Sequence, residues 1–469
     1  MGDSLESLKK LVSRNDGLEL VTEEAVRAEL SHDTWMRSLL QRRAGYVPEI
    51  ARAVVRPSTT ADVSALLEWA EASQTAVVPY GLGSGVCGGV LAGADTVVID
   101  MRNMAAMVEI NEETLNVRVQ PGMCGADFER ELNSRGLSMG HFPQSIGVSS
   151  VGGWCATRAS GQFSTRYGNI EDMMVGCEVV LAGGKVVRMP ASPRSSTGPD
   201  LKELFMGSEG TLGIFTELTF RVHELAEESA GCCYTLDSVA AGIEAMRLVM
   251  RAGWRPAAMR LYDATEAGRH FSMDGAEGQP ALLIVSEGPA ALVESEVRAV
   301  GEIVEKAGGR SRGSGPVESW LEHRNEVPSF DELVDRGLVV DTIEVAVGWD
   351  RLAGLFETAI ARGAAIEGVM VMSGHLSHCY GDGANIYFTF VGTCSEADDA
   401  TALYDRVWEA TMEATLEAGG TIAHHHGIGR VRKDWLRREL GPAHEVLRAL
   451  KRTLDPSGIM NPGVLMDMD

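Results

Sequence analysis

The chain has 469 residues, of which 45% are hydrophobic and 23% are charged, so it can bury a large core. Its 42 Lys and Arg against 66 Asp and Glu give a net charge of −24, which excludes the basic footprint of a nucleic-acid-binding protein. No run approaches the roughly 20 apolar residues of a membrane span, and the first residues lack the apolar core of a signal peptide. The eight cysteines show neither C-x-x-C spacing nor the density of a disulfide framework. We therefore expect a cytoplasmic protein with no nucleic-acid partner and no stable membrane insertion.

The hydrophobic pattern predicts an α+β fold. Residues 1–45 have the leucine spacing of polar amphipathic helices, with no visible chemistry. Strand-like runs follow at 75–81, 95–101, 115–122, 177–189 and 213–222. From about residue 226, helices at 237–251 and 290–307 alternate with strands at 280–288 and 386–392, and a long helix is expected at 396–420. We expect N-terminal helices (1–45), a first domain (46–225), a central α+β cap domain (226–395) and a C-terminal helical segment (396–469).

Three glycine-rich segments, each beside a predicted strand, indicate a large ligand. In the first, Gly83, Gly85 and Gly88 match G-x-G-x-x-G, but too few residues follow for the helix that a Rossmann dinucleotide site needs. Successive glycines can instead turn their N–H groups toward one anion. The other two segments are 145–174 and 206–217. Ordinary tight turns are the alternative interpretation for each segment taken singly.

Residues 46–222 resemble the flavin-binding domain of the vanillyl-alcohol-oxidase and p-cresol-methylhydroxylase superfamily. The resemblance implies an FAD whose pyrophosphate lies on the first loop, whose flavin is lined by Ser145 to Ala156, and whose polar edge meets the backbone near Ile214. The implied cofactor-binding residues are Pro79, Gly81, Gly83, Ser84, Gly85, Val86, Gly88, Ser145, Ser149, Ser150, Gly152, Gly153, Thr157, Ser160, Glu209, Gly210 and Ile214. We expect non-covalent FAD, with Cys87 simply packed in its loop.

Within that superfamily, SSVGGWCATRASGQFSTRYGNIEDMM (149–174), SHCYGDGANIYFTF (377–390) and HHHGIGRVRKDWL (424–436) look like alkyldihydroxyacetonephosphate synthase. The resemblance implies exchange of an acyl for an alkyl group through a flavin N5 adduct, in ether lipid synthesis. It assigns acid/base work to Tyr387, assistance to His424, His425 and His426, and an active-site position to Arg260. A lipid-like or other small-molecule substrate and a homodimer are further family expectations. Ile386, Phe388 and Phe390 are expected to keep the surroundings of Tyr387 dry.

Two departures from the family patterns keep alternatives open. Phe330 stands where the synthases have a second arginine, which Arg324 or Arg336 would have to replace. The related metal-assisted 2-hydroxy-acid dehydrogenases hold their ion with two His and one Glu. Here only His378 remains, with Tyr387 and His425 at the other two positions, so we expect no metal. The alternatives are an FAD-dependent oxidase or dehydrogenase of an alcohol or 2-hydroxy acid, and a flavin-binding protein without catalysis.

The histidine run and the basic residues after it each have a plainer interpretation. The run can be a polar turn before a helix, and three adjacent imidazoles cannot all ligate one metal ion. The basic residues could attract an anionic headgroup or form a solvated helix face; they are Arg430, Arg432, Lys433, Arg437 and Arg438.

Overall fold

The computed structural model describes residues 2–271, 273, 275–327, 330–394 and 397–467. Its first part is a four-stranded sheet in the order β1 (Leu18–Val21), β2 (Ala53–Pro57), β4 (Thr96–Asp100) and β3 (Ala76–Tyr80). The three strands β2, β4 and β3 are parallel, and β1 is antiparallel to β2. Helix α4 (Thr60–Ala72) connects β2 to β3 and begins with a capping box between Thr59 and Asp62.

The prediction that residues 1–45 are all helical was wrong in one place. Helices α1 (Gly2–Val12), α2 (Glu24–Glu29) and α3 (Met36–Arg43) are present, but β1 lies between α1 and α2. In β1 the side chains of Leu18 and Val21 are buried, because the strand completes the edge of the first sheet. Alternating leucines are compatible with either element, and the pairing with β2 decides for the strand.

The second part is an antiparallel five-stranded sheet. Its strands, in spatial order, are β5 (Met107–Asn111), β6 (Asn116–Val119), β10 (Ile214–Arg221), β8 (Met174–Val180) and β9 (Val186–Met189). The elements beside it are α5 (Gly125–Asn133), β7 (Leu137–Ser138), α6 (Val151–Thr157), α7 (Ser164–Tyr167), α8 (Ile170–Met173) and β11 (His223–Glu224), with 3₁₀ turns at Met101–Asn103, Ala182–Gly184 and Leu201–Leu204. The second glycine-rich segment is therefore largely three short helices.

The third part is an antiparallel seven-stranded sheet in the order β15 (Arg310–Ser311), β12 (Glu228–Thr235), β14 (Ala281–Gly288), β13 (Ala258–Tyr262), β17 (Val369–Leu376), β18 (Gly383–Thr393) and β16 (Leu338–Gly348). Its helices are α9 (Val239–Arg251), α10 (Ala264–His270), α11 (Ala290–Lys306), α12 (Gly315–His323), α13 (Phe330–Asp335), α14 (Trp349–Ala364) and α15 (Ala397–Glu417). The largest buried cluster lies under this sheet and includes Met36 and Leu40 of α3.

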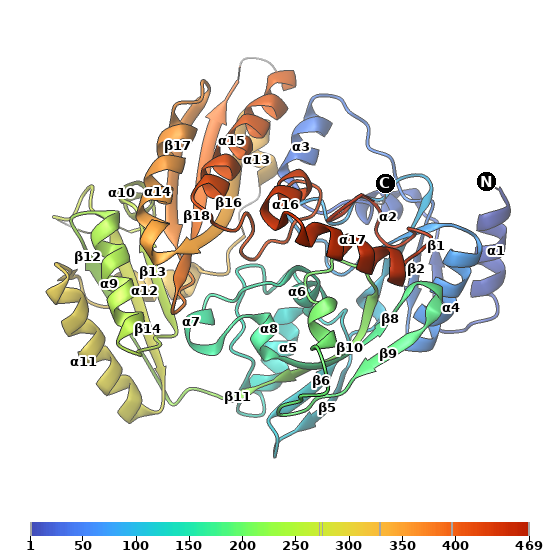
Figure 1. The fold of residues 1–469 in the computed structure, drawn as a ribbon, viewed down its shortest axis with the longest axis horizontal. Helices are drawn as coiled ribbons and strands as arrows, with labels where there is room; N and C mark the ends of the chain where they lie inside the picture. Colours follow the sequence, from blue (N-terminus) through green and yellow to red (C-terminus); the bar gives the residue numbers. More distant parts are fainter. Residues whose placement is uncertain (1, 272, 274, 328–329, 395–396, 468–469) are drawn as a thin grey trace.

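The C-terminal residues join the parts together. After α15, helices α16 (Lys433–Leu440) and α17 (Ala443–Leu454) lie between the seven-stranded sheet and the smaller sheets (Figure 1). Met460 then forms a parallel bridge with Val77 of β3. Between α15 and α16, residues 421–432 pass from the large sheet to the first glycine loop, and this segment carries the histidine run.

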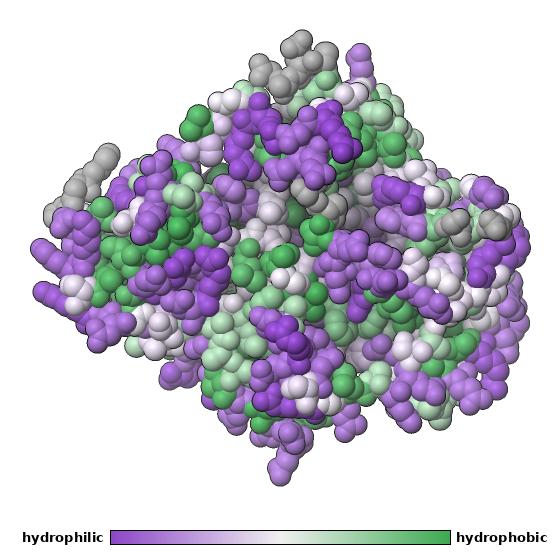
Figure 2. All heavy atoms as spheres, turned by 180° about the vertical axis from the view of Figure 1, so that it is seen from behind, coloured by the Kyte–Doolittle hydropathy of each residue, from purple (hydrophilic) through white to green (hydrophobic). Residues whose placement is uncertain are grey.

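Hydrophilic side chains interrupt the hydrophobic ones across the face seen in Figure 2. Among the helices that the structure describes, none has the length and hydropathy needed to cross a bilayer.

Candidate active site

The three glycine-rich segments meet at the carboxyl end of β3. A Cβ added to Gly81 would lie 2.2 Å from Ser150 Oγ, and one added to Gly210 would lie 2.3 Å from Pro79 Cγ. Gly210 also has a φ of +74°, which favours glycine. Glu209 N donates to Ala156 O at 2.9 Å. The three predicted glycine segments therefore meet in one place, and no helix follows the first loop before β4.

The predicted cofactor residues fall into two groups in this arrangement. Ser84, Val86, Ser145 and Thr157 keep partial exposure on the loops and at the end of α6, whereas Ile214 is buried at the start of β10. Others serve the loops themselves: Ser150 caps α6 by accepting from Gly153 N, Ser149 Oγ accepts from Trp154 Nε1, and Gly88, with a φ of +72°, lies against the Trp35 ring. Gly83, Gly85 and Gly152 lie in the same loops, and Ser160 is buried near Tyr380.

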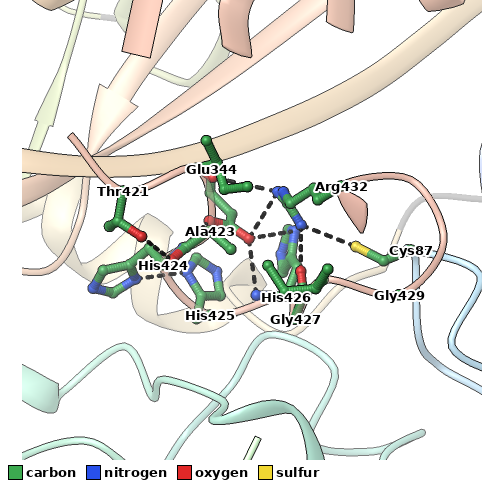
Figure 3. A network of polar contacts seen from close by, with 12 residues as sticks. Cys87, Glu344, Thr421, Ala423, His424, His425, His426, Gly427, Gly429 and Arg432 are labelled. Atoms are coloured by element: carbon green, nitrogen blue, oxygen red, sulfur yellow. Dashed lines mark hydrogen bonds and ion pairs between the residues drawn. The ribbon is translucent and has the colours of Figure 1, made fainter. Parts of the chain in front are cut away.

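The histidine run is held by a buried ion pair. Glu344 on β16 accepts hydrogen bonds from the backbone N–H groups of His424 and His426, the latter at 2.8 Å. The guanidinium of Arg432 lies 3.0 Å from the Glu344 carboxylate, and both side chains are fully buried (Figure 3). Burial alone would raise the pKa of Glu344, but Arg432 holds it below its ordinary value. Glu344 and Arg432 therefore fix the path of residues 424–426.

The basic residues after the run do not form one patch. Arg432 is the buried partner of Glu344, and its guanidinium also donates to Cys87 Sγ at 3.0 Å. Lys433 pairs with Asp467 and Arg438 pairs with Glu413 on the surface. The interpretation of this segment as a single headgroup-binding face was therefore wrong, because its central arginine points inward.

Tyr387 lies in a row of stacked rings. On β18 its ring is 4.8 Å from His375 at 25° and 6.0 Å from His425 at 21°. Burial raises the pKa of the Tyr387 phenol and lowers the pKa of His425. At neutral pH the row therefore holds a protonated phenol between uncharged imidazoles.

The expectation for the apolar neighbours of Tyr387 was wrong. Ile386, Phe388 and Phe390 are fully buried in the cluster under the large sheet. Because successive side chains of a strand point to opposite faces, they lie on the other side of β18 from Tyr387. The rings that surround Tyr387 are those of His375, His425 and His426.

Arg260 reaches the other end of this row. On β13 its guanidinium donates to Tyr262 Oη at 2.9 Å and bonds to His375 Nε2 at 3.0 Å. His375 Nδ1 is 2.7 Å from Glu266, and hydrogen bonds from His375 and Thr389 together with the charge of Arg269 lower the pKa of this carboxyl despite its burial. A tautomer with the proton on Nδ1 satisfies both contacts, so His375 connects Arg260 to Tyr387.

Arg324, and not Arg336, lies beside Arg260. The guanidinium carbons of Arg260 and Arg324 are 5.2 and 5.8 Å from the Trp320 ring centroid. Arg324 also lies over Phe142 and Phe163 and donates to Gln162 Oε1 at 3.0 Å. Arg336 is exposed, and Phe330 packs against the cluster under the large sheet.

His378, His424 and His425 form a compact group. Each offers one ring nitrogen, and these three atoms lie within 4.8 Å of one another. His424 Nδ1 is 2.8 Å from His425 Nδ1, and His378 Nδ1 is 2.7 Å from Ser164 Oγ. His426 is not part of the group. Two adjacent imidazoles of the run, together with that of His378, have the spacing of metal ligands.

Several residues of this site had no signal in the sequence. Glu344 and His375 reach the site through the pairing of β16, β17 and β18, whereas Tyr380 lies in the loop before β18 and Ser164 on α7. Asp33, in the N-terminal segment that showed no chemistry, accepts hydrogen bonds from Trp35 N and Val90 N and so supports the first loop.

Comparisons with known proteins match both parts of the chain. Residues 51–190 match the family model "FAD binding domain", and residues 226–465 match "FAD linked oxidases, C-terminal domain". The chain is 32% identical to an uncharacterized FAD-linked oxidoreductase, YgcU, of Escherichia coli K12, over 99% of this chain and 98% of the relative. It is 29% identical to an alkyldihydroxyacetonephosphate synthase of Dictyostelium discoideum over 92% of this chain and 76% of the relative. A mitochondrial D-lactate dehydrogenase of Danio rerio is 28% identical, with 88% and 84% covered.

Solved structures agree with the fold. A structure of alkyldihydroxyacetonephosphate synthase superposes with a TM-score of 0.82 at 26% identity, covering 98% of this chain and 85% of the other. p-Cresol methylhydroxylase superposes with a TM-score of 0.78 at 17% identity, covering 100% and 97%. Together the matches confirm the predicted fold of the p-cresol-methylhydroxylase type, the FAD cofactor and the enzymatic nature of the protein, which removes the non-catalytic alternative.

Proposed function

This chain belongs to the family of FAD linked oxidases, and from that premise we propose that it exchanges an acyl for an alkyl group on a phosphorylated ketone, as its relatives named alkyldihydroxyacetonephosphate synthase do. The observation that carries the proposal is the row of Arg260, His375, Tyr387 and His425. This row combines an anion-binding group with a phenol and an uncharged imidazole, and so matches a reaction in which protons move but no net electrons do.

The exchange breaks one C–O bond and forms another at the same carbon. A proton leaves that carbon, and the fatty acid departs with the electron pair of its C–O bond. The oxygen of a fatty alcohol takes its place and loses its own proton, and the first proton returns to the carbon. When bound, FAD supplies an electron-accepting ring beside that carbon. The uncharged His425 imidazole accepts a proton, and the Tyr387 phenol, which burial keeps protonated, donates one to the leaving group.

The two arginines on Trp320 support a phosphorylated substrate. Within the described part of the chain, neither guanidinium meets a carboxylate at ion-pair distance; their partners are Tyr262, His375 and Gln162. Burial lowers the pKa of Arg324 to about 10, which leaves it charged at neutral pH. Two such guanidiniums, without a counter-ion in the chain, favour a bound phosphate. In this proposal Arg324 takes the place of the arginine that Phe330 replaces.

The remaining parts of the proposal concern the whole molecule. FAD lies non-covalently between residues 46–225 and the cap of 226–395, and residues 396–469 complete the site. The substrate is lipid-like, and the protein is a cytoplasmic homodimer. The backbone contact of Arg430 N to Cys87 O, at 2.8 Å, supports the return of the C-terminal segment to the cofactor loop.

The variant Tyr387→Phe tests this function. FAD-loaded protein is incubated with acyl-dihydroxyacetone phosphate and a long-chain alcohol, and the ether product is measured by mass spectrometry. We expect turnover to be lost while FAD content and melting temperature stay those of the parent. Tyr234→Phe, which removes a hydroxyl on β12, is the matched control and should keep full turnover. Retained exchange in Tyr387→Phe would refute the assignment.

A second candidate is a metal-assisted FAD-dependent dehydrogenase of a 2-hydroxy acid. The group of His378, His424 and His425 favours it, since burial lowers the pKa of each imidazole and metal ions bind the neutral form. A bound divalent ion would polarise the hydroxyl and carboxylate oxygens of the substrate. Elemental analysis of the purified protein, with dye reduction by D-lactate and other 2-hydroxy acids, tests it; one ion per chain together with keto-acid product would establish it over the exchange reaction.

A further inference from the structure

Tyr380 is tied to the site through its hydroxyl group. It lies in the loop between β17 and β18, where its N–H donates to Gly383 O at 2.8 Å and its carbonyl accepts from Trp349 Nε1 at 3.3 Å. Its hydroxyl is 2.6 Å from His424 Nε2. The same hydroxyl is 2.9 Å from Asn169 Nδ2 and 3.2 Å from Asn169 Oδ1. Both ends of the side chain are therefore fixed.

The contact with His424 continues to His425. His424 uses Nε2 for Tyr380 and Nδ1 for His425 Nδ1, at 2.8 Å. An uncharged imidazole carries one proton, so the hydrogen bond at one nitrogen decides which nitrogen of the ring is the donor. If Tyr380 donates to His424, then His424 donates to His425 from Nδ1, and His425 carries its proton on Nε2. If His424 donates to Tyr380 instead, both hydrogen bonds reverse, and His425 Nε2 becomes an acceptor.

Asn169 lets the hydroxyl serve in either direction. When Tyr380 donates to His424, the amide N–H of Asn169 can donate to the phenol oxygen. When Tyr380 accepts from His424, its own O–H can donate to Asn169 Oδ1. Tyr380→Phe would remove this coupling and keep the ring whose centroid lies 5.6 Å from that of His424.

We propose that Tyr380 is a positioning residue which, by accepting a hydrogen bond from His424, keeps the proton of His425 on Nδ1 and leaves its Nε2 as the acceptor. The inference rests on the proposed function for its kinetic consequence, but the hydrogen-bond chain stands without it. Tyr380 touches neither of the residues to which proton transfer is assigned and acts only through His424. The proposal predicts that the hydroxyl of Tyr380 and the imidazole of His424 are one functional unit.

Other charged and titratable groups surround this chain, and the variants must leave them in place. The charged groups are Glu344 on β16, Arg432 after the histidine run, and Glu171 on α8. The remaining titratable neighbours are His378, His426, Tyr387 and Cys379. None of them bonds to the Tyr380 hydroxyl.

The first test is a double-mutant cycle on the exchange reaction with FAD-loaded protein. We expect Tyr380→Phe to lower kcat about 100-fold, the lower end of what general acid–base groups contribute, with KM changed less than about threefold. If Tyr380 acts through His424, then Tyr380→Phe/His424→Ala should be no slower than His424→Ala alone. Multiplying effects in the double variant, or full activity of Tyr380→Phe with intact FAD and melting temperature, would overturn the proposal.

The second test needs no turnover, and so separates this inference from the proposed function. In protein labelled with ¹⁵N-histidine, the ring-nitrogen resonances report which nitrogen carries the proton. Tyr380→Phe should shift the signals of two histidines, identified by their absence in His424→Ala and His425→Ala, whereas Tyr234→Phe should shift neither. Unchanged signals in Tyr380→Phe would overturn the proposal even if the exchange reaction is found. Shifted signals in a protein that lacks exchange activity would support the tautomer control and refute only the proposed function.

Discussion

Replacing Arg432 with methionine removes half of the buried ion pair that holds the histidine run. Arg432 and Glu344 are both fully buried, 3.0 Å apart, and the guanidinium lies 5.0 Å from the Trp408 ring centroid. Methionine keeps much of the packing but leaves the Glu344 carboxylate without a counter-charge. Removing one partner of a buried ion pair typically costs about 3–5 kcal/mol, because the remaining charge stays desolvated. We expect Arg432→Met to lose stability in this range.

The pH dependence of that loss has a defined sign. In the parent, burial would raise the pKa of Glu344, but Arg432 and the His424 N–H keep it below its ordinary value of 4.5. The stabilisation is therefore present above about pH 4.5 and is lost as the pH falls. In Arg432→Met the pKa of Glu344 rises above that of the unfolded chain, so stability is instead lost as the pH rises. Thermal melts of the FAD-loaded protein across this pH range measure both effects.

Two further variants make this experiment decisive. Arg432→Met/Glu344→Gln contains no unpaired charge and should regain most of the lost stability. Arg438→Met breaks an exposed ion pair with Glu413 and should change stability by less than about 1 kcal/mol. If Arg432→Met melts no lower than Arg438→Met, or if its stability still falls toward acid pH, the role given to the buried pair is refuted.

Three more predictions follow from other contacts of the site. Arg324→Met should raise KM for the phosphorylated substrate about tenfold or more, while Arg336→Met, at an exposed position, should leave KM unchanged; equal effects in steady-state kinetics would refute the role of Arg324. Burial raises the pKa of Asp33 from its ordinary value of 3.8 to about 7. The destabilisation that comes from ionising this buried carboxyl is therefore absent below about pH 4 and grows toward about pH 7. Across that interval the melting temperature of Asp33→Asn should fall less than that of the parent, and parallel curves would contradict this. Acid precipitation should release all FAD from the parent and from Cys87→Ser alike, and flavin retained by the parent's precipitate would disprove non-covalent binding.

Local signals in the sequence predicted much of the fold. The strands that became β3, β4, β6, β10 and β14, and the helices α9 and α11, lie within a few residues of their predicted bounds. The three glycine segments could be found because positive φ angles and close backbone approach demand glycine, as at Gly210. These features depend on residues near one another in the chain.

The parts that were missed depend on long-range pairing. Arg432 has the local appearance of a residue on a solvated basic helix, and only the arrival of β16 places Glu344 beside it. Asp33 supports a loop more than fifty residues away. The prediction that apolar residues surround Tyr387 failed for a different reason. The two-residue period of a strand already places Ile386 and Phe388 on the opposite face from Tyr387. The roles of the predicted site residues in catalysis stay predictions.

The central claim, redox-neutral exchange beside Tyr387, is tested most directly by the visible spectrum of the FAD-loaded protein without oxygen. A long-chain acyl-dihydroxyacetone phosphate is added first and a fatty alcohol second, and the products are identified by mass spectrometry. The account predicts that the flavin band bleaches with the first addition and recovers with the second, with one fatty acid and one ether formed. A band that stays unchanged with these reagents but bleaches with a 2-hydroxy acid, giving keto acid, would contradict it.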